Sequence, residues 1–401
     1  MRIALICDYS LDYLGGAQTA FLAEVAALTE AGHTVTVVSP STRDFPGDGA
    51  RSVRIRAAAT IPGLGLPIIR NTERVRCSLR ALYRDHAIEV VHVHSEFGLV
   101  AASIDVAIEF GLPVIHTVHT FFWRTHLPPL GQAVAAVALR GFQRWITAHK
   151  AGPAARDRPH ADAAMCHMTL TTARRASVVI SPSAHQRERL LSAGLRTVVA
   201  IPNTITTAGR RRGEPLTGIT GPLRLVWIGR CVREKRLVEF LAACRGALMQ
   251  LPAGALQVEI VGDGPLLAAA RIATATTPGI TFSGRLSSGG VMRALERAHL
   301  VALTSSGFDN QPMTVIEAVY AARGVLYVDA ALTEGVDAAG MLCATDSVDA
   351  ITNEILRLAA HPKSVIEVSQ RAATTFDEFA PGAHERQLSA VYRGLLVSLA
   401  T

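Results

Sequence analysis

The chain reads Gly307-Phe308-Asp309-Asn310-Gln311-Pro312-Met313-Thr314-Val315-Ile316-Glu317-Ala318 at a point where a loop is expected to open a helix. Proline fits the first helical turn, and the free amides of Met313 and Thr314, with the positive end of the helix dipole, favour an anion there. Glu317 lies about one turn further on, where its carboxylate can accept hydrogen bonds from vicinal hydroxyls such as those of a ribose. This stretch predicts a pocket for a phosphorylated ligand, and a nucleotide diphosphate fits both of its ends.

Short β-branched runs alternate with helical patterns along the chain, which is typical of parallel sheets covered by helices on both faces. With 401 residues, 49% of them apolar, the chain is long enough for two such α/β domains. A linker is expected at residues 204–222, which are rich in Thr, Gly and Pro. The first half has candidate strands at residues 2–7, 34–38, 90–94, 114–118, 178–180 and 198–201, and the second half at 223–228, 257–261, 280–282, 300–303 and 325–328.

Composition and cysteine usage indicate a cytoplasmic protein, soluble or peripheral at the inner face of a membrane. The six cysteines show no C-x-x-C pair and no metal-ligand spacing, so we expect reduced thiols. The N-terminus enters an apolar strand directly, without the longer apolar region of a signal peptide, and no stretch reaches the length of a membrane span.

An arginine-rich segment, residues 51–84, carries eight arginines against one acid, Glu73, and so a net charge of +7. It fits either a solvated face or a surface that contacts an anionic membrane. Residues 120–150 alternate apolar, aromatic and basic positions, which fits either a helix at a lipid surface or a helix packed in the core. Nucleic acid is disfavoured as a partner, because aromatic residues make up only 5% of the chain and no RNA- or DNA-binding motif accompanies the arginines.

Three glycine or basic motifs follow predicted strands. Gly15-Gly16 lets a backbone amide approach a phosphate or a sugar, although a double glycine alone is more often a simple turn. Arg230 and Lys235, five residues apart on a loop, are suited to clamp a diphosphate. Gly262-Asp263-Gly264-Pro265 lacks the third glycine of the dinucleotide fingerprint, which disfavours a nicotinamide or flavin enzyme.

Four histidines lie on or just after two neighbouring predicted strands: His92, His94, His116 and His119. The sequence shows no Cys or carboxylate cluster that completes a ligand set, so no metal site is expected. His119 follows the end of its strand and is placed to reach a ligand. The absence of a D-x-D pattern also argues against a diphosphate held by Mg²⁺.

In their order and spacing these motifs resemble the retaining GT-B glycosyltransferases of family 4, over nearly the whole chain. The resemblance implies two Rossmann-like doubly wound domains facing a central cleft. The N-terminal domain, residues 1–205, would bind the acceptor, the C-terminal domain, residues 206–380, would bind the nucleotide sugar, and residues 381–401 would form a helix packing back on the first. The motifs that carry the resemblance are Gly15-Gly16, Thr117-Val118-His119-Thr120, Ile180-Ser181-Pro182-Ser183, Ile201-Pro202-Asn203, Arg230 with Lys235, Gly262-Asp263-Gly264-Pro265 and Asp309 to Glu317.

Site residues follow from the same resemblance. His119 is similar to the histidine that contacts the donor sugar near the reacting centre, and Arg230 and Lys235 match the pair that neutralises the departing diphosphate. Asp309 stands where the family has its first Glu, which implies a catalytic residue that reaches toward the donor sugar with an arm shorter by one methylene. Asn203-Thr204 replaces the usual Asn-Gly. The residues expected to bind the donor are Gly16, Gly264, Asn310, Met313, Thr314 and Glu317.

The activity implied is transfer of a sugar, with retention, from a UDP- or GDP-sugar to a hydroxyl of a lipid or glycan acceptor. No metal and no cofactor are expected. The anomeric bond breaks through an oxocarbenium-like state, and Arg230, Lys235 and the amides near Met313 stabilise the leaving group. The alternative is a non-catalytic subunit of the same fold that assists an active transferase.

Overall fold

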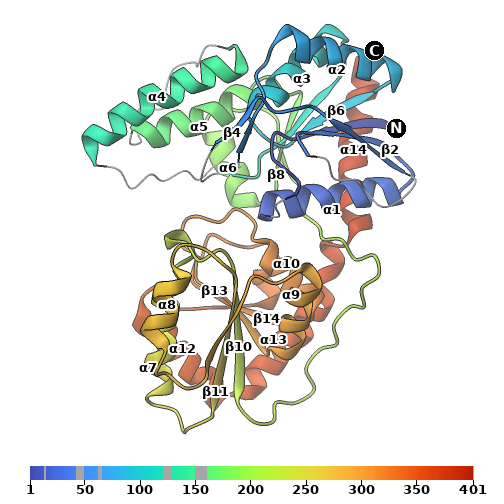
Figure 1. Cartoon of the computed structure of the whole chain (residues 1–401). Coiled ribbons are helices and arrows are strands. Elements are labelled where there is room, and N and C mark those ends of the chain that lie inside the picture. Colours follow the sequence, from blue (N-terminus) through green and yellow to red (C-terminus); the bar gives the residue numbers. More distant parts are fainter. Residues whose placement is uncertain (13–14, 42–48, 62–65, 121–127, 150–159, 401) are drawn as a thin grey trace. The chain divides into compact units, whose positions relative to one another are not determined.

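The computed structural model describes residues 1–12, 15–41, 49–61, 66–120, 128–149 and 160–400. The chain divides into two compact units (Figure 1). Unit 1 comprises Met1–Thr206 and Pro381–Thr401, and unit 2 comprises Thr207–Ala380. Each unit has its own parallel sheet with helices on both faces, which confirms the predicted α/β class.

Unit 1 has a parallel sheet in the order β3-β2-β1-β6-β7-β8-β9 among the described residues. β1 (Arg2–Ile6) lies between β2 (Thr34–Ser39) and β6 (Val90–Val93), and β7 (Val114–Thr117) follows β6. Because these strands are parallel, the carboxyl ends of β1, β6 and β7 lie at the same edge of the sheet. The other strands are β3 (Ala50–Arg54), β8 (Val178–Ser181) and β9 (Val198–Ala200), with a separate antiparallel pair β4 (Ala59–Ile61) and β5 (Leu66–Ile68).

Alternate residues of β1 enter two different cores of unit 1. Ile6 packs with residues of α2 and α3 on one face, whereas Leu5 packs with residues of α1 and α14, such as Leu28 and Tyr392, on the other. α14 lies along α1. The helices of unit 1 are α1 (Gly16–Glu30), α2 (Glu73–Asp85), α3 (Gly98–Glu109), α4 (Pro129–Thr147), α5 (His160–Ala173), α6 (Ala184–Ser192) and α14 (Pro381–Ala400).

Unit 2 has a parallel sheet in the order β12-β11-β10-β13-β14-β15 around a core that includes Trp227 and Phe240. Its strands are β10 (Leu223–Ile228), β11 (Leu256–Val261), β12 (Ile280–Gly284), β13 (Leu300–Leu303), β14 (Gly324–Tyr327) and β15 (Gly340–Leu342). Its helices are α7 (Leu237–Leu248), α8 (Leu267–Thr274), α9 (Ser288–Arg297), α10 (Met313–Tyr320), α11 (Val336–Ala339), α12 (Val348–Ala360) and α13 (Pro362–Thr375), with short 3-10 turns η1 (Arg233–Lys235) and η2 (Phe376–Glu378).

Every candidate strand is present, and the sequence analysis missed short strands such as β3 and β15, each at the edge of its sheet. β3 has the sequence Ala-Arg-Ser-Val-Arg, which lacks the apolar β-branched run that predicts a strand. Five of the six cysteines are buried, but Cys77 on α2 is exposed. Within the described part of the chain, no helix combines the length and the apolar character needed to cross a bilayer.

Candidate functional site

Unit 2 gathers its predicted site residues at one edge of its sheet. β10 and β13 are parallel neighbours, so the loops after Ile228 and after Leu303 leave from the same edge. Arg230 lies on the first loop, and Glu317 lies on α10, which follows the second. Arg230 is exposed, and its side chain forms no hydrogen bond or ion pair with the described residues. A guanidinium at this edge is open to an anionic ligand.

Lys235 and Asp309, predicted to act on different parts of a donor, form an ion pair with each other. Lys235 Nζ lies 2.5 Å from Asp309 Oδ1, and their side chains are 19% and 9% exposed. The ammonium also lies 5.6 Å from the ring centroid of Phe308. Asp309 Oδ2 is buried and has no hydrogen-bond partner among the described residues. The pair thus presents one cation and one unsatisfied acceptor oxygen.

A buried threonine ties the two loops together. Trp227 Nε1 donates to Thr304 Oγ1 at 3.1 Å, and the Thr304 hydroxyl donates to the carbonyl of Lys235 at 3.0 Å. The second loop is also held from β14, because Gly307 N donates to Asp329 Oδ2 at 2.7 Å. Thr304 and Asp329 were not predicted from the sequence, where each is marked by its position just after a strand.

The start of α10 presents backbone donors. Pro312 is the N-cap rather than a residue of the first turn, so the helix begins at Met313. The amides of Met313 and Thr314 have no hydrogen-bond partner within the described residues, as expected for the first positions of a helix. Asn310, one of the predicted ligand contacts, is buried in the loop just before them.

Glu317 is partly buried on α10, and its carboxyl group forms no hydrogen bond with a described residue. Burial raises the pKa of its carboxyl to about 7, although the charge of Arg210 acts in the opposite direction. A desolvated acid without a donor is costly unless a ligand supplies one. Its environment therefore suits hydroxyl groups that would hydrogen-bond to the ionised form.

Gly264 and its neighbour Gly262 allow the loop after β11 to pass against the loop after β10. Both have φ of +148°, and a Cβ atom on Gly262 would lie 1.8 Å from the carbonyl oxygen of Gly229. Cys231 N donates to the carbonyl of Asp263 at 2.8 Å in the same contact. The missing Cβ atoms of these glycines allow the close contact with the loop that carries Arg230. The structure therefore gives Gly264 a role in loop packing.

Unit 1 holds the other two predicted residues, Gly16 and His119. Gly16 is the exposed first residue of α1, which starts after β1, and His119 follows the end of β7. Asp8, which was not predicted from the sequence, follows β1 and caps α3 by accepting from the amides of Phe97 and Leu99 at 3.1 and 2.7 Å. Its burial raises its pKa to about 6.

Glu24 of α1 lies beside two of the four histidines. Its Oε1 is 2.9 Å from His92 Nδ1 and 3.3 Å from His94 Nε2. The expectation that no carboxylate completes the histidine set is therefore wrong, because the carboxylate comes from a helix far away in sequence. At these distances the nitrogens and the oxygen contact each other directly.

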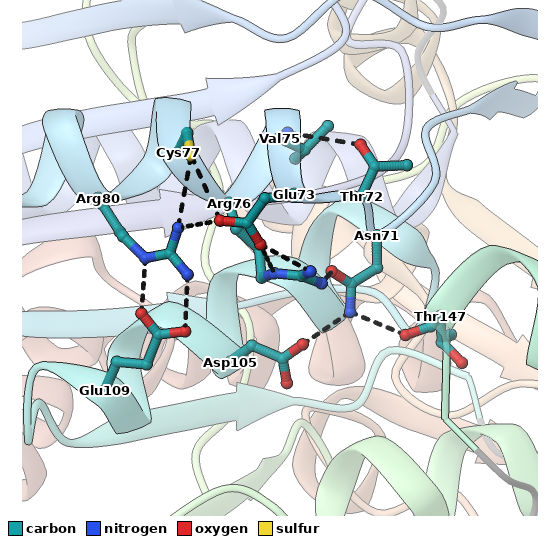
Figure 2. Close-up of polar contacts among 10 residues, drawn as sticks. All are labelled: Asn71, Thr72, Glu73, Val75, Arg76, Cys77, Arg80, Asp105, Glu109 and Thr147. Carbon is teal, nitrogen blue, oxygen red and sulfur yellow. Dashed lines mark hydrogen bonds and ion pairs between the residues drawn. The ribbon is translucent and has the colours of Figure 1, made fainter.

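Two arginines of the 51–84 segment form ion pairs with described residues of unit 1 (Figure 2). Arg76 binds Glu73 Oε2 at 2.8 Å and Asn71 Oδ1 at 2.7 Å. Arg80 bridges Glu73 and Glu109, at 2.6 and 2.7 Å. The six others are exposed: Arg51, Arg54, Arg56, Arg70, Arg74 and Arg84. The segment offers a smaller charge to a partner than its sequence indicates.

The sequence matches two family models, Glycosyltransferase Family 4 over residues 14–208 and Glycosyl transferases group 1 over residues 222–361. It is 24% identical over 312 residues to the GDP-mannose-dependent alpha-mannosyltransferase of Corynebacterium glutamicum. That match covers 71% of this chain and 62% of the relative's length.

Solved structures with the same fold extend over almost the whole chain. HepE of Anabaena, in complex with UDP and glucose, is 13% identical with a TM-score of 0.67, covering 98% of this chain and 100% of that one. Sucrose-phosphate synthase of Thermosynechococcus elongatus is 16% identical with a TM-score of 0.68, covering 99% and 100%. At these identities the likeness shows the fold.

Proposed function

Because this chain belongs to glycosyltransferase family 4 and has the GT-B fold, we propose that it transfers a sugar from a nucleotide diphosphate sugar to an acceptor hydroxyl. The observation that carries the proposal is the edge of unit 2, where Arg230, the Lys235–Asp309 pair, two helix amides and a desolvated Glu317 share one side of a sheet. The relatives bear on the donor, since one is GDP-mannose-dependent and another is solved with UDP and glucose.

Each group at this edge has a chemical task in the proposal. Arg230, Lys235 and the amides of Met313 and Thr314 neutralise the pyrophosphate as its bond to the sugar breaks. Glu317 accepts hydrogen bonds from the two ribose hydroxyls. Asp309 Oδ2 accepts a hydrogen bond from a hydroxyl of the donor sugar, because it has no hydrogen-bond partner among the described residues. The contacts expected of Gly16 with the donor's phosphate and of His119 with its sugar stay predictions.

The reaction we propose retains the anomeric configuration and uses neither a metal nor a cofactor. The cations and amides of unit 2 supply the positive charge that a metal would otherwise bring to the diphosphate. No side chain is assigned as a nucleophile, and the departing phosphate takes the acceptor's proton.

A panel of UDP- and GDP-sugars, scored for hydrolysis and transfer with and without EDTA, tests the proposal. We expect one donor to be consumed at an EDTA-independent rate, with an anomeric coupling constant in the product that matches the donor. Binding of UDP or GDP without turnover of any donor would favour the non-catalytic subunit instead, and an inverted product would refute the retaining step.

The acceptor we propose is a lipid or glycan at an anionic membrane, on the evidence of α4. One face of this helix packs on α5, and the opposite face exposes Leu130, Val134, Val137 and Trp145, which are 79, 64, 72 and 47% exposed. Arg70 stacks on Trp145 at 4.7 Å, and Arg140 and Arg144 are exposed on α4. An apolar stripe with arginines beside it fits lipid headgroups and the upper acyl region. The exposed arginines of 51–84 add charge to the same unit.

Flotation on liposomes with and without anionic lipid tests the membrane contact. We expect V134E/V137E to lose flotation on anionic liposomes. The matched control is M249E/I272E, which makes the same apolar-to-acidic change at positions of unit 2 that are 87 and 79% exposed. Equal flotation of both variants, or no flotation of the wild type, would refute the role of α4.

A further inference from the structure

Arg210 lies against the face of α10 that carries Glu317. Tyr320 follows Glu317 by three positions, so the two side chains leave the same face of the helix. The Tyr320 hydroxyl donates to the carbonyl of Arg210 at 3.0 Å, and Gly213 N donates to the carbonyl of Tyr320 at 3.0 Å. These two bonds fix the backbone of residues 210–213 at the end of α10.

The side chain of Arg210 reaches from this face to the start of α9. Its Nη2 donates to the hydroxyl of Ser288, the first residue of α9, at 2.5 Å. Within the described part of the chain this is the only hydrogen bond of the guanidinium, which has five N–H donors. Burial raises the pKa of Glu317 and the charge of Arg210 opposes that rise, so the guanidinium is close enough to act on the carboxylate. Arg210 therefore offers donors to a ligand beside Glu317.

The base of a nucleotide held as proposed lies next to Glu317, because the base is joined directly to the ribose that this residue binds. The pyrophosphate is assigned to the loops after β10 and β13 and to the start of α10. β12 is parallel to β11, and β11 to β10, so α9, which follows β12, begins at the same edge of the sheet. The Arg210 guanidinium, between the Glu317 face and the start of α9, is placed to meet the base.

The hydrogen-bonding groups of the bases decide which one suits an arginine. Guanine presents two adjacent acceptors, N7 and O6, whereas adenine presents N7 beside an amino donor. In uracil an N–H donor separates the two carbonyl oxygens. A planar guanidinium can therefore bind guanine through two parallel hydrogen bonds, but it can bind uracil through one only.

We propose that Arg210 is a specificity-determining residue that binds N7 and O6 of guanine, so that the donor is a GDP-sugar. The inference rests on the proposed function and names the base of its donor. Ser288 orients the guanidinium and leaves its other N–H groups for the base. Since a bidentate arginine–guanine pair discriminates against the wrong base by roughly 5- to 150-fold, GDP should bind the wild type more tightly than UDP by about that factor.

Calorimetry of the full chain with GDP and UDP measures this preference, and Arg210→Ala should bring the ratio of the two affinities close to one. Both nucleotides share the ribose and the pyrophosphate, so a change in those contacts would weaken them equally. Two analogues locate the contact on the base. Inosine diphosphate keeps N7 and O6, so Arg210→Ala should weaken its binding as much as that of GDP. 7-Deaza-GDP has a C–H in place of N7, so the same substitution should weaken its binding much less.

Two further variants separate the planar fork from the charge. Arg210→Lys keeps the charge without the fork and should lose the preference for GDP as Arg210→Ala does. The matched control is Arg211→Ala, which removes a neighbouring arginine whose side chain is 86% exposed and paired with Glu214; it should leave both affinities unchanged. The variants of Arg210 retain the bond from Tyr320, because its acceptor is the backbone carbonyl.

Equal affinity of the wild type for GDP and UDP, tighter binding of UDP, or an equal loss for both nucleotides in Arg210→Ala would overturn the inference. Each of these results would leave the proposed function standing, because a nucleotide still binds. Binding of neither nucleotide would count against the proposed function itself, and the inference would fall with it.

Discussion

Glu317 gives the proposed nucleotide site a pH dependence whose size can be worked out. Its pKa of about 7 in the free protein reflects burial, and only the ionised form has two free acceptor oxygens to which both ribose hydroxyls can donate. Binding must therefore remove the proton, so affinity is full above this pKa and is lost as the pH falls through it. For a pKa of about 7, a pH change from 8 to 6 weakens nucleotide binding about tenfold, or about 1.4 kcal/mol.

Calorimetry with UDP and GDP at several pH values measures this effect. The nucleotide's own phosphate also titrates in this range, so the quantity to compare is the pH dependence of the wild type minus that of Glu317→Gln. The variant keeps the size of the side chain and cannot ionise. At pH 8 it should bind roughly 10- to 100-fold more weakly than the wild type, the value of hydrogen bonds to a charged group. Parallel pH profiles for the two proteins would refute the role of Glu317.

Three further outcomes follow from the geometry of unit 2. Lys235→Ala should lower kcat by roughly two to three orders of magnitude, as for other donors that stabilise a leaving group. Lys363→Ala, at an exposed position, is the control and should not lower kcat. Equal turnover by the two variants would remove Lys235 from the site. Thr304→Val leaves Trp227 Nε1 without its acceptor and should lower the free energy of unfolding by about 1–3 kcal/mol in a denaturant titration. Gly262→Ala places a Cβ atom against the Gly229 carbonyl and should lower Tm. The loss should be far larger than for the control Gly254→Ala, where φ is also positive but the Cβ atom meets no neighbour. Similar Tm values for the two variants would show that the loop contact is dispensable.

The sequence was sufficient for most of the strands and for the loops that carry charge, because apolar β-branched runs and glycines are local signals, whereas polar edge strands such as β3 lack that signal. It was not sufficient for pairings across the chain. Lys235 and Asp309 are separated by 74 positions, and the pairing of an ammonium with the acid expected to act on the sugar depends on β10 and β13 being neighbours. Glu24 looks like an ordinary residue of an amphipathic helix, and only the packing of α1 on the sheet brings it to His92 and His94.

The central claim is that the sheet edge of unit 2 that carries Arg230 and Lys235 binds a pyrophosphate. Calorimetry of UDP and GDP with the wild type and with the double variant Arg230→Ala/Lys235→Ala tests this claim most directly. The account predicts saturable binding of at least one nucleotide by the wild type and a loss of roughly tenfold or more in the double variant. No binding at millimolar nucleotide, or equal affinity in both proteins, would contradict it.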